Sequence, residues 1–251
     1  RSQGENHVPK DYRHEEIEGF ELHLKSSLHY KMNELNNIDV QLDKLAGKMH
    51  VHPLRFENFN GGFHFEDEHL VVTDFKGKMG RTQFDIDMNY YLGEDEAIKK
   101  RDNSFSLKSD FIDFDALSNF GTAESQKINQ EVKLEKNTAD VSEHTEAFNL
   151  YELPFTDMQF NVDVGHFIYH RLDLKDIEAQ LRTTHNHYIY LDTVSLNAAG
   201  GHIAMNGYFN GSDPELVYLK PTLDVTGIDL DKLLFKFENF GQDAVVSENL
   251  H

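Results

Sequence analysis

The chain lacks several kinds of residue, and each absence excludes a class of structure. No cysteine or tryptophan occurs among its 251 residues, and only five are proline. Without cysteine there are no disulfide bonds and no thiolate metal sites, although the redox compartment stays open. Lys and Arg are scarce, 24 against 44 Asp and Glu, which leaves a net charge of -20. Because this surplus repels phosphate backbones and no basic patch is visible, we expect no nucleic-acid partner.

Long apolar runs and catalytic motifs are also missing. No run approaches the roughly 20 apolar residues of a membrane-spanning helix, and no signal-peptide core is present. The chain starts at Arg1 rather than methionine and stops at His251 in a polar stretch, as expected of a soluble piece excised from a longer protein. There is no Gly-x-Ser-x-Gly elbow and no Walker-type glycine loop. We therefore expect a protein that is not an enzyme and has no cofactor.

The sequence is rich in alternating apolar and polar residues. In residues 84–90, every second side chain is apolar and those between are Asp or Asn. Shorter copies of the pattern occur at 22–25, 63–66, 162–164, 217–220 and 223–226. This period of two predicts antiparallel strands with one apolar and one solvated face. Helical patterns are confined to 114–120 and 230–237, which follow the potential capping residues Asp113 and Asp229.

The two halves of the chain share a pattern that predicts an internal repeat. Residues 30–42 align without gaps with 169–181, and 107–117 match 223–233 at one offset. With a gap, Gly61-Gly62 falls opposite Gly200-Gly201. Each unit would hold strands, a Gly-Gly corner, more strands and a short helix. The predicted divisions are a polar segment (1–19), a first β-rich repeat (20–120), an acidic linker or mobile loop (121–152), a second β-rich repeat (153–240) and a polar tail (241–251).

Several residue pairs have both a functional and a structural interpretation. Both Gly-Gly pairs are typical of a bulge or sharp bend, which we favour over a site of ligand approach. Two histidine pairs at i,i+2 could each supply two metal ligands: His50 with His52, and His185 with His187. No carboxylate completes a metal-binding motif with either pair, so we expect no metal site. Residues 113, 115, 229 and 231 are aspartates placed before apolar helical patterns, which indicates helix capping rather than paired catalytic acids. Residues 93–103 are expected to form a charged loop.

The second half resembles the C-terminal region of the AsmA family, in the AsmA and TamB group of bacterial envelope proteins. The resemblance rests on the order and spacing of four segments: 166–181, 189–192, 197–207 with its Gly200-Gly201, and 227–234 with its Ile-Asp-Leu-Asp. It covers residues 160–240 well and 20–120 more loosely. The family's N-terminal membrane helix is absent from this sequence, so anchoring would come from outside this chain.

This resemblance implies an all-β fold with few short helices, a curved antiparallel sheet forming an open groove or half-barrel. It also implies location at the periplasmic face of the bacterial inner membrane and a role in lipid transport or outer-membrane homeostasis. The partners would be phospholipid or another lipid, the membrane, and other envelope proteins. The residues alone leave three ways to cover an apolar strand face: closure of the sheet, packing of sheet on sheet, or an open trough that takes acyl chains.

The candidate lipid-binding residues are the apolar members of the alternating segments. They are Phe84, Ile86, Met88, Tyr90, Val162, Val164, Ile177, Leu181, Ile189, Leu191, Val194, Leu196, Ile203 and Met205. The alternative for the same residues is the closed core of a sandwich. Two other functions stay open, a non-catalytic periplasmic scaffold that recruits partners by strand addition and a carbohydrate-binding β-domain, although the lack of tryptophan weakens the second.

Overall fold

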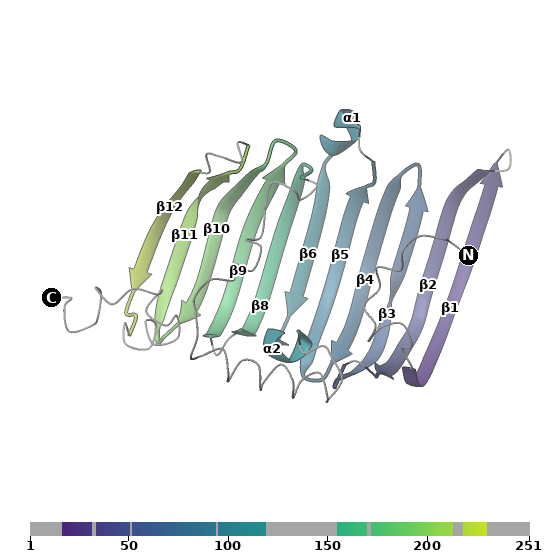
Figure 1. Ribbon diagram of the computed structural model, residues 1–251, viewed down its shortest axis with the longest axis horizontal. Helices are drawn as coiled ribbons and strands as arrows, with labels where there is room; N and C mark the ends of the chain where they lie inside the picture. Colours follow the sequence, from purple (N-terminus) through teal and green to yellow (C-terminus); the bar gives the residue numbers. More distant parts are fainter. Residues whose placement is uncertain are drawn as a thin grey trace, which may run out of the picture.

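The described part of the chain forms one twelve-stranded sheet that is curved, mostly antiparallel and not closed into a barrel (Figure 1). The computed structural model describes residues 17–31, 34–50, 52–93, 95–118, 155–169, 172–212 and 218–229. The single curved sheet confirms the prediction of an all-β fold with a curved antiparallel sheet. The predicted linker at 121–152, the second helix at 230–237 and the polar tail lie outside the described residues.

The first series of strands is an antiparallel meander. It consists of β1 (Ile17–Lys31), β2 (Glu34–Met49), β3 (Arg55–Glu66), β4 (His69–Met79), β5 (Thr82–Tyr91) and β6 (Asn103–Ser109). A one-turn helix, α1 (Glu96–Lys99), lies between β5 and β6 where the sequence predicted a charged loop. The short β7 (Ile112–Asp113) and α2 (Phe114–Leu117) follow β6.

The second series is another antiparallel meander. It consists of β8 (Met158–Tyr169), β9 (Leu172–Thr184), β10 (Tyr188–Ala198), β11 (Gly201–Asn210) and β12 (Tyr218–Thr226). The two series join where β6 runs parallel to β8, and β7 also pairs with β8 in parallel. The parallel junction makes one sheet of both, so an apolar face can continue from one series to the other.

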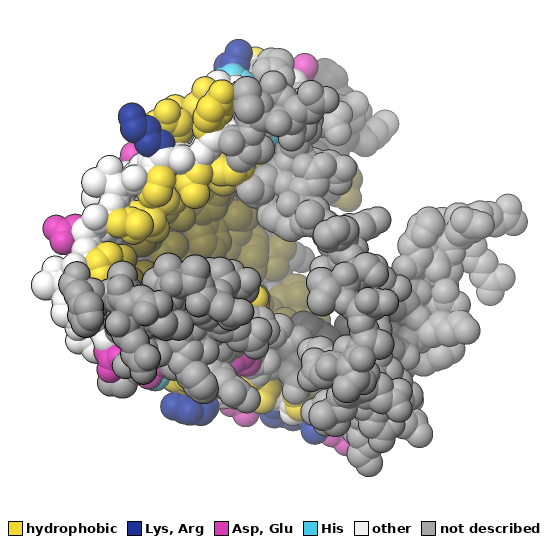
Figure 2. Space-filling view, turned by 60° about the vertical axis from the view of Figure 1, so that its left-hand side comes forward, with side chains coloured by type: hydrophobic (Ala, Val, Ile, Leu, Met, Phe, Trp, Pro, Cys, Tyr) yellow, Lys and Arg dark blue, Asp and Glu magenta, His cyan; other side chains and the backbone are white. Residues whose placement is uncertain are grey.

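Bulges near the middle of several strands bend the sheet. Asn58 in β3, Asp74 in β4 and Asp176 in β9 have φ angles of 53°, 49° and 50°. Each lies within a shift of register against a neighbouring strand. Asn and Asp tolerate this left-handed conformation better than most residues, and a bulge bends its strand and increases its twist. The outcome is a hollow lined by hydrophobic side chains (Figure 2).

Both Gly-Gly pairs lie at bends, as predicted, but at different places in the two series. Gly61 lies inside β3 beside a register shift, and a Cβ there would be 2.8 Å from the Phe75 Cα. Gly200, with a φ of 83°, is in the turn between β10 and β11, and a Cβ on Gly201 would be 2.4 Å from the Ile228 nitrogen. The two pairs therefore do not occupy equivalent positions.

The capping prediction holds for Asp113. Its carboxylate accepts a hydrogen bond of 2.9 Å from the backbone N–H of Ala116 at the start of α2. This satisfies one of the donors that a helix leaves unpaired at its N-terminus. The helix covers 114–117 rather than the predicted 114–120. Asp229 ends the described residues of the second series, and its backbone N–H donates to the Ala199 carbonyl.

Few apolar side chains are buried, because the described sheet is a single layer. The buried hydrophobic residues in the described part of the chain are Leu42, Ala46, Val72, Ile112, Phe155, Val164 and Ala198. The other apolar side chains of β3 to β6 and β8 to β11 are mostly half-buried. Two packed sheets would bury both inner faces. Within the described residues, no second sheet covers the apolar face of this one.

Candidate functional site

An apolar row crosses the whole sheet from β1 to β12. It follows the register of paired residues, in which directly opposed side chains lie on the same face. From β1 to β12 it consists of Ser26, Val40, Phe63, Val72, Met88, Phe105, Phe160, Leu181, Leu191, Gly207 and Pro221. Only its first member carries a polar side chain.

A second row runs beside the first on the same face. It consists of Phe75, Ile86, Leu107, Val162, Ala179, Val194, Met205 and Leu223. We call the two rows and their same-face neighbours the apolar lane. Strands lie about 4.8 Å apart, so a lane across the eleven strands of the main path is roughly 48 Å long.

The structure places every candidate lipid-binding residue on this one face. The four from β5 alternate along an unbroken stretch, and Val164 opposes Ile177 across β8 and β9. Ile189 opposes Phe209, and Leu196 opposes Ile203. Val164 is 2% exposed, whereas all the others are half-buried. The register therefore brings these residues together, and most retain surface that a ligand could cover.

Sequence reasoning missed an aromatic cluster in the first series. The Phe59 ring lies 5.3 Å from that of Phe84 and 5.7 Å from that of Phe75, which in turn lies 5.4 Å from Phe63. Phe56 packs edge-on against Phe59 at 6.1 Å. The bulge at Asn58 puts Phe56 and Phe59 on one face although they are three residues apart. A search for strict alternation does not recognise that Phe56 and Phe59 share a face. The only sequence signal for the cluster was the high phenylalanine content, 19 residues.

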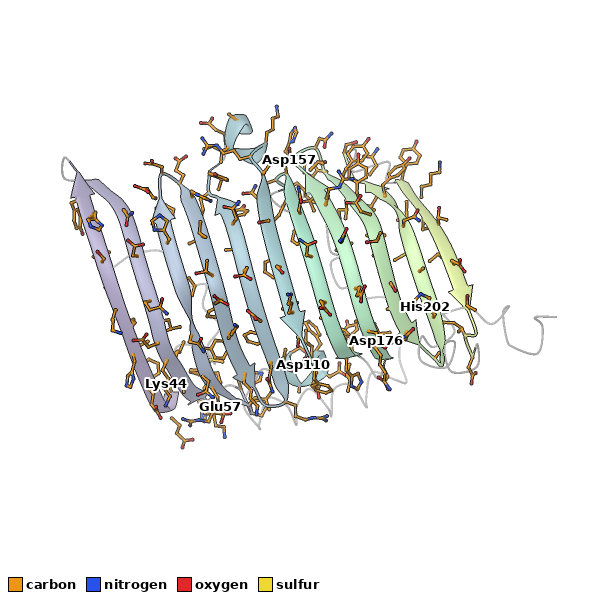
Figure 3. The ribbon with its side chains drawn as sticks, turned by 180° about the vertical axis from the view of Figure 1, so that it is seen from behind. Lys44, Glu57, Asp110, Asp157, Asp176 and His202 are labelled. Atoms are coloured by element: carbon orange, nitrogen blue, oxygen red, sulfur yellow. The ribbon has the colours of Figure 1, made fainter. Side chains whose placement is uncertain are left out.

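The face opposite the apolar lane, which we call the outer face, carries charged pairs within and between strands. Lys25 lies 3.0 Å from Asp43, and Lys76 lies 3.1 Å from Asp74 and 3.3 Å from Asp85. The hydrogen bonds that Lys76 donates to the Asp74 and Asp85 carboxylates raise the pKa of Lys76. These pairs are solvent-exposed, so each contributes little to stability. Their main effect is to keep the outer face hydrated. Figure 3 shows the sheet with its side chains as sticks, from the side opposite to the view of Figure 1.

Arg182 and Asp192 form the best-aligned pair on the outer face. The Arg182 Nε and Nη2 atoms donate to the two carboxylate oxygens of Asp192 at 2.5 and 2.7 Å. The hydrogen bonds to Arg182 hold the pKa of Asp192 below its ordinary value and raise that of Arg182. Because each charge is matched by the other, the pair adds no net charge to the surface around it.

The histidine pairs considered for metal binding have other contacts. His52 is 1% exposed; its Nδ1 accepts from the Leu54 N–H at 3.1 Å, and its Nε2 therefore donates to the Leu117 carbonyl at 2.9 Å. His185 Nδ1 lies 2.7 Å from the Asp157 carboxylate, and the His187 ring lies 4.9 Å from that of Phe155. Within the described ranges, no group of three or more metal-ligating side chains is found.

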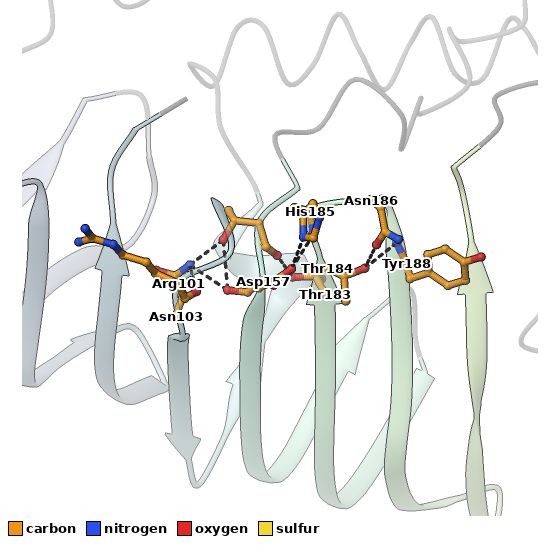
Figure 4. Close-up of polar contacts among 9 residues, drawn as sticks. Arg101, Asn103, Asp157, Thr183, Thr184, His185, Asn186 and Tyr188 are labelled. Atoms are coloured by element: carbon orange, nitrogen blue, oxygen red, sulfur yellow. Dashed lines mark hydrogen bonds and ion pairs between the residues drawn. The ribbon is translucent and has the colours of Figure 1, made fainter. Parts of the chain in front are cut away.

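A polar network closes the junction between the two series (Figure 4). Asn103, 1% exposed, donates from its amide to Thr156 Oγ1 at 2.7 Å and to the Asp157 carbonyl at 2.8 Å. Its amide oxygen accepts from the Tyr91 N–H at 2.7 Å. The Asp157 carboxylate in turn accepts from the His185 N–H at 2.8 Å. These bonds fix the starts of β6 and β8 side by side, which is a structural role.

Comparison with family models, curated proteins and solved structures finds no match for this chain. Among the described residues, no helix has the length and apolar character to span a bilayer. The functional conclusion therefore depends on the geometry of the lane.

Proposed function

We propose that this chain is an AsmA-like domain that shields lipid acyl chains in its apolar lane. The observation that carries the proposal is a half-exposed apolar surface that continues across every strand of the main path while the other face is charged. Monomeric proteins rarely expose apolar patches larger than a few hundred Å² unless they bind something there. An elongated hydrocarbon matches the dimensions and chemistry of such a surface.

The energetics favour an acyl chain that binds firmly in the apolar lane and can still move along it. Each methylene withdrawn from water gains about 0.8 kcal/mol, so an acyl chain of a dozen methylenes gains on the order of 10 kcal/mol. This gain depends on buried area rather than direction. A chain can therefore shift along consecutive rows at little cost, and this movement needs no nucleotide in the lane itself. The charged headgroup would stay in water outside the hollow.

The proposed setting extends the AsmA resemblance. The domain would act at the periplasmic face of the bacterial inner membrane, held through an anchor that is not part of this chain, and would serve lipid transport or outer-membrane homeostasis. Other envelope proteins would be its neighbours. The polar outer face, with its exposed ion pairs, supports this setting because it suits an aqueous compartment.

The test uses adjacent residues on opposite faces of β11. Met205 faces the lane opposite Val194 and Leu223, whereas Asn206 is exposed on the other face. We expect Met205→Asp to lower pickup of a fluorescent phospholipid at least about tenfold, because a carboxylate must then be desolvated beside the acyl chain. Asn206→Asp places the same charge one residue away and should leave pickup unchanged. Ile86→Asp in the first series should behave as Met205→Asp does.

Mass spectrometry of organic extracts completes the test. Protein purified without detergent should carry phospholipid, and the Met205→Asp variant should carry less while remaining folded by circular dichroism. In a closed core, the same substitution would bury an unpaired charge and prevent folding. Repeated absence of phospholipid from the wild-type extract, together with no binding of the fluorescent lipid, would refute the proposal.

A further inference from the structure

Four tyrosines form a pocket on the outer face of the second series. The pocket holds about 320 Å³ and is lined by Tyr188, Tyr190, Tyr208, Asn210 and Tyr218, from β10, β11 and β12. The rings of Tyr188 and Tyr190 are nearly parallel, 12° apart with centroids at 5.8 Å. The Tyr208 ring lies 6.4 Å from the first and 6.3 Å from the second. This aromatic surface lies on the face opposite the apolar lane.

The register arranges these residues in two rows with polar groups between the rings. In one row, Asn210 pairs with Tyr188 on one side and Tyr218 on the other. In the other, Tyr190 pairs with Tyr208. The Asn210 amide oxygen accepts hydrogen bonds from the N–H and the hydroxyl of Ser212. One amide group therefore lies between two tyrosines in the first row.

The lining of the pocket carries no charge, and charged groups lie beside it. The Arg182 guanidinium lies 4.8 Å from the centre of the Tyr190 ring, and Asp192 binds it through both carboxylate oxygens. Lys220 opposes Tyr208 across β11 and β12, on the side of the pocket away from Arg182. None of the residues lining the pocket is charged, so the lining itself offers stacking and neutral hydrogen bonds rather than ion pairs. The occupant favoured by these groups is uncharged.

We infer that the tyrosine pocket binds a neutral saccharide. A sugar ring presents C–H groups on its faces and hydroxyl groups around its edge, and aromatic rings interleaved with an amide complement both. The pocket is lined by aromatic and amide side chains and by no aliphatic one, which matches the two kinds of surface that a sugar presents. Its volume is at the lower end of the roughly 300–1,000 Å³ of ligand pockets, which suits a short stretch of glycan.

The experiment titrates the whole chain with cellohexaose, maltohexaose and chitohexaose by isothermal titration calorimetry. At least one should bind, and Tyr190→Ala should weaken that binding about fivefold to tenfold because a stacking surface is lost. Tyr190→Phe keeps the ring and should bind within about threefold of wild type, since a single neutral hydrogen bond contributes little. Ser195→Ala, on the same strand and the same face outside the pocket, is the matched control.

Two further variants keep the result interpretable. Tyr218 is 53% exposed at the edge of the sheet, so Tyr218→Ala should fold even if Tyr190→Ala does not, and it should also weaken binding. Phospholipid pickup by both variants should stay at the wild-type level, which separates this site from the lane. The inference is wrong if none of the three hexasaccharides binds at millimolar concentration, if binding survives in the Tyr190→Ala Tyr208→Ala double variant, or if oligogalacturonate binds more tightly than all three.

Discussion

Single residues on the outer face give the protein its local electrostatics. His64 is the clearest case: its Nδ1 lies 2.7 Å from the Asp39 carboxylate, and its Nε2 lies 3.7 Å from that of Glu66. The hydrogen bond to Asp39 raises the pKa of His64 above its ordinary value of 6.5. Folding therefore favours the protonated ring.

This shift predicts a pH-dependent contribution to stability. A raised pKa means that the pair contributes fully below about pH 6.5, the ordinary value for histidine, and that the contribution is lost as the pH rises through the higher folded-state pKa. We expect Asp39→Asn to lower the His64 titration midpoint measured by NMR. The stability difference between wild type and variant, measured by urea unfolding, should shrink above pH 6.5. A difference that grows with pH would contradict this assignment.

The bulge residues show what one position can conceal from sequence analysis. Regular alternation in β5 predicted correctly which residues share a face, since the strand has no interruption between Thr82 and Tyr91. In β3, a φ of 53° at Asn58 resets the alternation, so Phe56 and Phe59 were not recognised as part of the lane. Asparagine tolerates the left-handed conformation of a bulge, but it also occupies ordinary strand positions such as Asn89 and Asn206, so its identity alone does not locate a bulge.

Among the elements, the pairing of β6 with β8 is the feature that local patterns could not predict. Hairpins are indicated by neighbouring strands and a turn, whereas this parallel pairing joins residues 55 positions apart in sequence, such as Asn103 and Met158. The resemblance between the halves predicted two units but gave no direction for their joint. The buried Asn103 network now accounts for the position of that joint.

Removing the Asn103 side chain should weaken the junction. Asn103→Ala leaves the Tyr91 N–H without the amide oxygen that accepts its hydrogen bond, which costs about 1–3 kcal/mol. Chemical denaturation should show this loss in the free energy of unfolding. The neighbouring Ser104 lies half-buried on the outer face, and Ser104→Ala should change stability by less than about 0.5 kcal/mol. Equal losses in the two variants would contradict the role given to Asn103.

At the scale of the whole molecule, the two outermost strands of the described sheet differ. Residues 17–30 of β1 are exposed along an edge without proline, and Phe20, Leu22, Leu24 and Leu28 are 45–50% exposed. The edge strand β12 contains Pro221, which has no N–H to donate. Long apolar edges favour pairing with another chain, and proline opposes it. The open β1 edge also supports the scaffold alternative, in which partners add a strand.

This asymmetry predicts self-association through β1. The weight-average mass measured by sedimentation should rise with protein concentration, and Leu24→Lys should suppress the rise because a charge is placed on the pairing edge. Leu223→Lys makes the same change on β12 and should have a smaller effect. The prediction fails if the wild type stays monomeric at all concentrations or if the two substitutions act equally.

The directions of the strands determine at which border of the sheet the segments before β1 and after β12 are attached. Six antiparallel strands, a parallel step and four further reversals make β12 run opposite to β1, so β1 begins and β12 ends along the same long border of the trough (Figure 1). Chain that comes before residue 17 or after residue 229 is therefore attached along this one border of the sheet. A tether attached on either flank would therefore hold the sheet by this border, and neither tether would be attached at the opposite border.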